Sequence, residues 1–545
     1  MMPNLWYKNA IVYCVDVEKF MDASGDGTGD FAGLADRLDH LERLGVTCIW
    51  LNPFFPSPNR DNGYDITDYY GVDPRYGTLG DFVEFMHAAR DRGMRVIIDL
   101  VVNHTSTDHP WFQAARSDEN SPFRDWYVWS KEKPENAHEG MVFPGVQDSI
   151  WSYDRTAKAW YLHRFYDHQA DLNTANPAVR EEILKIMGFW LALGVSGFRL
   201  DAVPFLIDTK GMKLEPGSFD PYSLLTEMHD FMAWRRAGAV LLAEANIPYS
   251  DAPAYFDGGD RMNMIFDFML NQHLFLSLAR GTAAPLRHTL QNRPRPDGLG
   301  QWANFLRNHD ELDLGRLSIA EREEAFAALG PDASMQIYER GLRRRLAPML
   351  EGDMSRLKLA YSLLFALPGT PVLWYGEEIG MGENLALPER EAVRTPMQWA
   401  DEPNAGFSRA ATANLIQPIL ADGDFGYQNV NVAQQVREPG SLLRSITRLV
   451  QTRRSTPEIG WGEWELVDVG RDDVLALSYS WRGARVVTVH NFSPEPVSFP
   501  LEIDGIDRFE PLLADHDAQS AILRGETLDM AGFGFCWLRC DGPRK

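Results

Sequence analysis

The feature that most constrains the fold of this chain is the alternation of short apolar runs with amphipathic helical segments. Eight such runs predict strands, and helical periodicity separates the first of them clearly. The predicted strands span residues 11–15, 46–51, 95–101, 197–199, 240–243, 264–268, 302–306 and 371–374. Eight successive βα units predict an α/β protein with a closed (β/α)8 (TIM) barrel, whose functional side chains lie at the carboxyl ends of the strands.

Local signals support two of the predicted helices. Leu34, Leu38 and Leu41 share one face of a segment that ends at Gly45, which is typical of a helix closed by glycine. The sequence Thr78-Leu-Gly-Asp has the form of a capping box and predicts a second helix that ends near Gly93. Both helices are therefore expected between the first three strands.

Two stretches depart from the alternation, and a chain of 545 residues is too long for one core. Residues 104–170 are rich in aromatic and charged side chains and too long for an ordinary loop, which predicts a subdomain inserted after the third strand. Short alternating strands such as 474–481 and 484–489 predict a C-terminal β-sandwich over 458–545. The barrel is predicted to comprise 1–103 and 171–457.

Charge and hydropathy exclude several classes of partner. The net charge of −24 argues against nucleic acid and anionic membranes, because phosphate is bound by clustered Lys and Arg. No apolar stretch reaches the roughly 18 residues of a membrane span, and the N-terminus lacks the form of a signal peptide. The four cysteines are too sparse for a disulfide framework, so we expect reduced thiols and a cytoplasmic protein. The pattern indicates no particular oligomeric state.

Four predicted strands end in polar clusters. A lone Asp at a strand end commonly caps a helix or pairs with a cation. Four clusters at one end of a barrel, three of them supplying a carboxylate, indicate chemistry instead, because converging like charges are costly. The clusters are Asp99-Leu-Val-Val-Asn103-His104, Gly197-Phe-Arg199-Leu-Asp201, Ala243-Glu244-Ala-Asn246 and Arg307-Asn308-His309-Asp310.

These clusters resemble the conserved regions of glycoside hydrolase family 13, the α-amylase superfamily. Further matches occur at Gly63-Tyr-Asp65, 169–173 and 375–378, so the resemblance runs over nearly the whole chain. It implies that Asp201 is the nucleophile, Glu244 the general acid/base and Asp310 the carboxylate that stabilises the transition state. Retaining glycosidases need one ionised carboxylate and one protonated acid. Arg199, on the same side of the strand as Asp201, is expected to keep Asp201 ionised, whereas Glu244 needs a raised pKa.

The resemblance also assigns substrate-binding residues. His104 and His309 are similar to the family's pair that hydrogen-bonds the first glucose ring. The segment Asp61-Asn-Gly-Tyr64 resembles the exo-acting members, in which the Asp caps the non-reducing glucose and the Tyr stacks beneath it. Arg394 resembles the Arg that pairs with that Asp. Such a pair would close the pocket at one end and favour small-molecule α-glucosides over starch.

Two metal sites are expected, both structural and both for Ca²⁺ (or Mg²⁺ in the first). In the first, oxygen ligands alternate with glycines, as hard cations prefer, and the same loop binds metal in oligo-1,6-glucosidase-like and trehalose-synthase-like relatives. Its residues are Asp22, Ser24, Asp26, Thr28 and Asp30. The second site rests on the resemblance alone and comprises Asn103, Asp171 and Asp208.

Within the family the chain resembles the trehalose synthases, which are maltose α-glucosyltransferases. The segments that carry this resemblance are 343–350, 394–399, 404–409 and 426–431. Such an enzyme cleaves maltose, retains the glucose and rejoins it as trehalose, which a site closed to water favours. The alternative is an α-glucosidase that hydrolyses maltose, sucrose or isomaltose-type substrates. An α-amylase and a non-catalytic relative are the remaining alternatives, and activity on starch against maltose separates the first of these.

Overall fold

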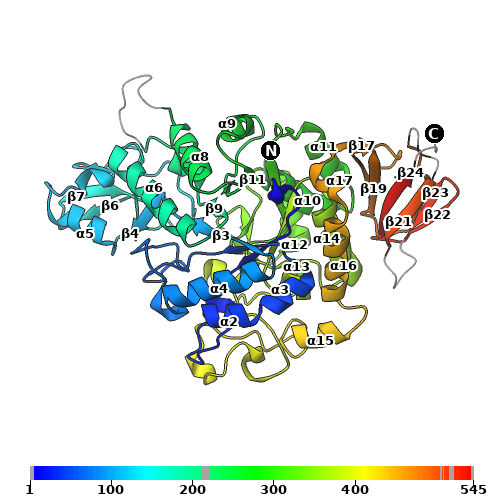
Figure 1. Ribbon diagram of the computed structural model, residues 1–545, viewed down its shortest axis with the longest axis horizontal. Helices are drawn as coiled ribbons and strands as arrows, with labels where there is room; N and C mark the ends of the chain where they lie inside the picture. The colour runs from blue at the N-terminus through cyan, green and yellow to red at the C-terminus, as the bar shows by residue number, and fades with distance from the viewer. Residues whose placement is uncertain (1–4, 211–219, 504–505, 507, 515–520, 542–545) are drawn as a thin grey trace.

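Eight parallel strands close into a barrel, as the alternating pattern predicts (Figure 1). The structure is a computed structural model that describes residues 5–210, 220–503, 506, 508–514 and 521–541. Around the barrel the strands follow the order of the chain. They are β1 (Val12–Val15), β2 (Cys48–Leu51), β3 (Arg95–Leu100), β9 (Gly197–Leu200), β10 (Val240–Ala243), β11 (Met264–Phe266), β12 (Gln301–Phe305) and β16 (Thr370–Trp374). Each lies within three residues of its predicted bounds.

Helices cover the outside of the barrel, which explains why the strands are apolar on both faces. They include α2 (Phe31–Asp36), α3 (Leu38–Leu44), α4 (Leu79–Asp91), α6 (Pro177–Ala192), α8 (Ser223–Arg235), α10 (Phe268–Arg280), α11 (Ala284–Asn292), α12 (Ile319–Leu329), α14 (Met354–Ala366) and α16 (Leu442–Arg454). Thr78 and Asp81 form the predicted capping box of α4, and Gly45 ends α3 with a φ of 95°. The helix expected through Leu34 and Leu41 is two helices, because the backbone leaves helical geometry at Arg37.

The segment after β3 forms a small lobe on one side of the barrel (Figure 1). Its first strand, β4 (His104–Ser106), pairs antiparallel with β8 (Gln169–Asp171), so the chain leaves and returns at adjacent points. Between them lie α5 (Pro110–Ser117) and a sheet of β5 (Trp129–Ser130), β7 (Ala159–Leu162) and β6 (Trp151–Asp154). Val128, Ile150 and Leu162 belong to its own small core.

Two antiparallel sheets form the C-terminal β-sandwich on the opposite side of the barrel (Figure 1). The first contains β17 (Glu463–Val467), β18 (Val474–Trp481), β19 (Ala484–Asn491), β24 (Phe535–Asp541) and β21 (Arg508–Ala514). The second contains β20 (Val497–Pro500), β23 (Thr527–Met530) and β22 (Ala521–Arg524). Apolar side chains from both sheets meet in one core. The Ser362 hydroxyl on α14 lies 2.9 Å from His490 Nε2 and accepts a hydrogen bond from Trp537, which ties the sandwich to the barrel.

A further small sheet, which was not predicted from the sequence, lies at the barrel mouth. It consists of β13 (Leu312–Asp313), β15 (Gly341–Leu342) and β14 (Gln336–Ile337), and it follows the Asp310 cluster. Each strand has two residues, too few to leave a period-two pattern in the sequence. Among the described residues, no helix is both long and apolar enough to cross a bilayer.

Candidate active site

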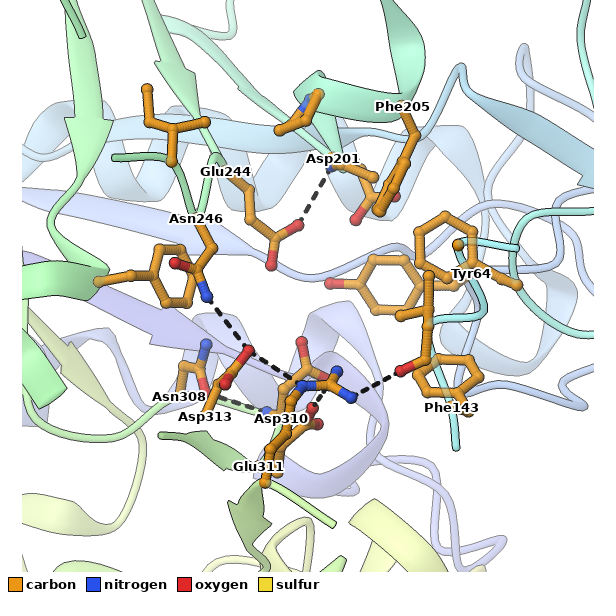
Figure 2. Close-up of a pocket in the computed structure, with 18 of the residues that line it drawn as sticks. Tyr64, Phe143, Asp201, Phe205, Glu244, Asn246, Asn308, Asp310, Glu311 and Asp313 are labelled. Carbon is orange, nitrogen blue, oxygen red and sulfur yellow. Dashed lines mark hydrogen bonds and ion pairs between the residues drawn. The ribbon is translucent and has the colours of Figure 1, made fainter. Parts of the chain in front are cut away.

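A cavity of about 800 Å³ opens where the barrel strands end, within the range of roughly 300–1,000 Å³ that small-molecule sites occupy (Figure 2). Seven of the nine residues predicted for catalysis and substrate binding line it. They are Asp61, Tyr64, His104, Asp201, Glu244, His309 and Asp310. The other two, Arg199 and Arg394, are buried behind this lining and contact it. The structure therefore brings the whole predicted set together.

Arg199 organises the floor of the cavity. It lies on β9, two residues before Asp201, and its Nη1 is 2.8 Å from Asp201 Oδ1 and 3.1 Å from Asp99 Oδ1. Its Nη2 is 2.7 Å from Glu244 Oε2. One buried guanidinium thus contacts three carboxyl groups, and its single positive charge cannot balance all three in the ionised form. Burial raises the pKa of Asp201 to about 6, and Arg199 opposes that rise.

Glu244 occupies the position expected of a proton donor. It follows β10 directly, and its Oε2 accepts a hydrogen bond of 3.2 Å from the backbone N–H of Ala202. Burial raises the pKa of Glu244, Arg199 lowers it, and the negative charge of Asp201 raises it further; the net shift is upward. A carboxyl group with a raised pKa is suited to donate a proton near neutral pH.

Asp310 lies in the opposite electrostatic environment. It follows β12, and its Oδ1 is 2.6 Å from Arg390 Nη1 and 3.0 Å from Arg394 Nη2, while its Oδ2 is 3.1 Å from His309 Nε2. Burial alone would raise the pKa of Asp310, but these three groups hold it well below its ordinary value. Asp310 is therefore a carboxylate at neutral pH, whereas the pKa of Glu244 is raised.

Asp61 faces two arginines, the predicted Arg394 at a longer distance and Arg390, which was not predicted, at a shorter one. Arg394 Nη1 is 3.9 Å from Asp61 Oδ1, whereas Arg390 Nη2 is only 2.9 Å away, and Gln169 donates a second hydrogen bond of 2.9 Å. Arg394 also donates to Asp310 and to the His309 carbonyl. Arg390 precedes Arg394 by four residues in the same loop. The presence of a second arginine there was the signal in the sequence that could have indicated Arg390 as a partner of Asp61.

Aromatic and imidazole rings form the wall beside Asp310. Tyr64 stacks on His309 with centroids 5.3 Å apart and planes inclined by 9°. The Tyr64 hydroxyl donates to Asp99 over 2.7 Å, and His104 Nε2 lies 3.0 Å from the Tyr64 carbonyl. Burial lowers the pKa of both His104 and His309, so both rings are suited to hydrogen-bond hydroxyls in the neutral form.

The opposite side of the cavity carries polar residues that the sequence analysis did not select. Asn246 donates to Asp313 Oδ2 over 3.1 Å (Figure 2). Arg340 contacts both Asp313 and Glu311. Burial and the charge of Asp310 raise the pKa of Glu311 to about 7. Glu311 directly follows the Asp310 cluster, and Asn246 ends the Glu244 cluster. Their positions beside the catalytic residues in the sequence could have indicated that they line the pocket. This side offers hydrogen-bonding groups for a second sugar.

The loop of the first predicted metal site brings three of its five residues together. Asp22 Oδ1 accepts from the Ser24 hydroxyl over 3.0 Å, and the Ser24 amide donates to Asp30 Oδ2 over 2.9 Å. Asp30 also caps α2 through Gly33. Asp26 is exposed and accepts from the Thr28 amide within the loop. The buried oxygens of Asp22 and Asp30 suit a hard cation, while Asp26 lies outside their cluster.

At the second predicted metal site, a lysine ammonium lies between two of the three predicted ligands, Asn103 and Asp171. Lys210 Nζ donates to Asn103 O and Oδ1 over 3.0 and 2.9 Å and to Leu172 O over 2.9 Å, and it lies 3.1 Å from Asp171 Oδ2. Asp208 instead pairs with Arg164 over 2.9 Å. Within the part of the chain that the structure describes, no three acidic, Cys or His side chains form a cluster suited to a metal.

The fold and the cavity together define an enzyme that cleaves or transfers glycosidic bonds. Three carboxylates at the ends of β9, β10 and β12 face one sugar-sized space, with different protonation tendencies. The chain belongs to the alpha-amylase family: residues 15–319 and 342–462 match the description "Alpha amylase, catalytic domain".

Relatives of this chain span nearly its full length. The protein named "Trehalose synthase/amylase TreS" of Mycobacterium tuberculosis (strain ATCC 25618 / H37Rv) is 41% identical over 99% of this chain and 93% of its own length. "Oligo-1,6-glucosidase" of Parageobacillus thermoglucosidasius is 29% identical over 95% and 96%. The solved structure of the trehalulose synthase MutB from Pseudomonas mesoacidophila MX-45 is similar with a TM-score of 0.78 and 29% identity over 98% of this chain and 99% of that one.

Proposed function

We propose that this enzyme is a retaining maltose α-glucosyltransferase of the trehalose-synthase type. The observation that carries the proposal is the closed end of the cavity, where Arg390 joins Asp61 to Asp310. A pocket closed at this end accepts one terminal glucose and excludes a longer chain. The full-length similarity to proteins named trehalose synthase supports maltose as the substrate.

The residues suggest a two-step reaction. Asp201 attacks C1 of the terminal glucose while Glu244 gives its proton to the departing glycosidic oxygen, which leaves a β-glucosyl ester and free glucose. The 1-hydroxyl of that glucose then attacks C1, Glu244 takes back the proton, and the C1–O bond to Asp201 breaks. Asp310, whose charge Arg390 and Arg394 maintain, is placed to stabilise the cationic transition states.

A hydrolytic α-glucosidase is the second candidate. Its support is the similarity to oligo-1,6-glucosidases and the same carboxylate arrangement, which serves hydrolysis equally well when water opens the ester. An α-amylase requires a cleft open at both ends, which the Arg390 bridge argues against.

One incubation tests these candidates. Purified enzyme is mixed with maltose, and glucose, maltose and trehalose are resolved by anion-exchange chromatography, with Asp201→Asn as the inactive blank. We expect trehalose to be the main product and to return maltose when it is supplied alone. Glucose as the sole product would identify the α-glucosidase, and faster turnover of soluble starch than of maltose would contradict the closed pocket.

We also propose a structural Ca²⁺ or Mg²⁺ at the loop of residues 22–30 and a cytoplasmic location. The buried oxygens of Asp22 and Asp30 support the cation, and the buried thiols of Cys14, Cys48 and Cys536 support a reducing compartment. Removal of the metal should lower the melting temperature more than it lowers activity at moderate temperature. A melting temperature unchanged after metal removal verified by elemental analysis would contradict the cation site.

A further inference from the structure

The turn between β14 and β15 adopts a strained backbone. Ile337 pairs with Gly341, and the two residues next to Ile337, Tyr338 and Glu339, both have positive φ, at 54° and 59°. Positive φ is uncommon for residues other than glycine, and hairpin turns that require it normally use Asn or Gly. Strain of this kind persists where surrounding contacts fix it, and it is concentrated at functional sites. The contacts of this turn therefore indicate what it does.

Tyr338 anchors one side of the turn. Its ring lies 4.7 Å from that of Phe143 in the inserted lobe, and its hydroxyl donates to Glu389 over 2.7 Å. Glu389 directly precedes Arg390, which binds Asp61 and Asp310. The turn is thus connected to the closed end of the pocket and to the lobe.

Arg340, the next residue of the turn, contacts both the inserted lobe and the barrel. Its Nη1 donates to the Val142 carbonyl over 2.8 Å, its Nε lies 3.3 Å from Asp313 Oδ2, and its Nη2 lies 3.4 Å from Glu311 Oε1. Val142 belongs to the inserted lobe, whereas Glu311 and Asp313 follow barrel strand β12. In Figure 2, Phe143 lies on one side of the cavity and Asp313, Glu311 and Asn246 lie on another. Arg340 bridges these two sides.

The bridge is placed where a released sugar would leave. Asp61 and Arg390 close the end that holds the transferred glucose, so the second glucose occupies the side lined by Asn246, Glu311 and Arg340. The Arg340 side chain is only 21% exposed, and its guanidinium joins the lobe to that side of the barrel. Breaking the bridge removes the direct contact between Val142 of the lobe and the Glu311–Asp313 side of the barrel, at the place where glucose must remain between the two steps.

We propose that Arg340 is a specificity-determining residue that keeps the released glucose in the pocket and so favours transfer over hydrolysis. The proposal rests on the proposed trehalose-forming function. With Arg340 in place, the glucose cut from maltose is the one that attacks the glucosyl ester. Without it, that glucose exchanges with the medium, and water reaches the ester.

The test follows the origin of the acceptor. Wild type, Arg340→Ala and Arg340→Lys are incubated with unlabelled maltose and an excess of uniformly ¹³C-labelled glucose, and mass spectrometry measures label in the trehalose formed. Wild type should give mainly unlabelled trehalose. Arg340→Ala should incorporate label and raise the ratio of hydrolysis to transfer roughly tenfold or more, since the charge-assisted contacts to Val142, Glu311 and Asp313 are lost. Arg340→Lys, which keeps the charge, should fall between them.

Glu339→Gly is the matched control, because Glu339 is exposed and glycine suits its positive φ. This variant should keep the wild-type label pattern and product ratio. Arg340→Lys carries the test if Arg340→Ala is recovered unfolded, as judged by circular dichroism.

The outcomes separate the two proposals. Absence of trehalose from wild type would overturn the proposed function and, with it, the role of Arg340. If wild type forms trehalose whose acceptor glucose is labelled to the same fraction as the glucose in the medium, the proposed retention is overturned and the proposed function is not. A normal label pattern and product ratio in both folded Arg340 variants would also overturn the proposed retention, and a fall in total turnover without a change in ratio would assign Arg340 a merely structural role.

Discussion

Replacing Lys210 with methionine tests whether its ammonium stands where a metal was expected. The Lys210 side chain is 1% exposed and that of Asp171 is 0% exposed, and their polar atoms are 3.1 Å apart. Methionine keeps most of the volume and removes the charge, so Asp171, the Asn103 carbonyl and the Leu172 carbonyl lose their common donor. Breaking a buried pair in this way costs about 3–5 kcal/mol.

The lower end of that range, ~3 kcal/mol, is expected because Asp171 Oδ1 keeps a hydrogen bond of 2.8 Å from the Arg164 amide. With an unfolding entropy of about 2.1 cal/mol/K per residue over a cooperative unit of roughly 450 residues, this loss lowers the melting temperature by about 3 °C. Differential scanning calorimetry at one scan rate measures it, with Lys185→Met as control, since Lys185 is 55% exposed. An unchanged melting temperature in Lys210→Met would refute the reasoning.

Three further predictions concern the active site. Asp201→Asn, Glu244→Gln and Asp310→Asn should each lower kcat by several orders of magnitude while circular dichroism stays native, and near-normal turnover in purified Asp201→Asn would exclude it as the nucleophile. Because the Asp201 pKa is about 6 and attack needs the ionised form, kcat/KM should fall as the pH drops below about 6. Arg199→Met removes the charge that lowers this pKa, so the acidic limb of the pH profile should move to higher pH. An acidic limb that stays in place would contradict the assignment. Arg390→Ala removes two charge-assisted contacts and should raise the activation free energy for maltose by ~2–4 kcal/mol, which lowers kcat/KM about 30- to 1,000-fold in steady-state assays. Unchanged KM and kcat would show that the bridge does not hold substrate.

The parts of the fold that follow from local pattern were predictable. The barrel strands are apolar because helices cover their outer faces, and the capping box at Thr78 is a short-range signal, so both can be read from the sequence. The strand-end carboxylates Asp201, Glu244 and Asp310 followed from the same pattern, since parallel strands end on one face of the barrel.

The remaining features depend on contacts between distant segments. Lys210 has no local signal, because a lysine in a loop is usually solvated, and only the folded chain places Asn103 and Leu172 around it. Arg390 and Arg394 both pair with Asp61, and only the loop conformation makes Arg390 the closer of the two. The turn at Tyr338 lacks the Asn or Gly that hairpin turns with positive φ normally use, because tertiary contacts and not local preference fix its backbone.

The antiparallel ribbon of β4 and β8, in which His104 lies opposite Asp171, has a mechanical consequence. Both connections between the lobe and the barrel run through this ribbon, so it can serve as a single hinge. A rotation there would carry Phe143 and Val142 away from the barrel as one body and leave the strand ends that bear the catalytic carboxylates undisturbed. Such a rotation would break the polar contacts of Arg340 and also apolar packing, because Phe112 and Tyr127 of the lobe belong to the same hydrophobic core as the barrel and Phe143 packs on Tyr338.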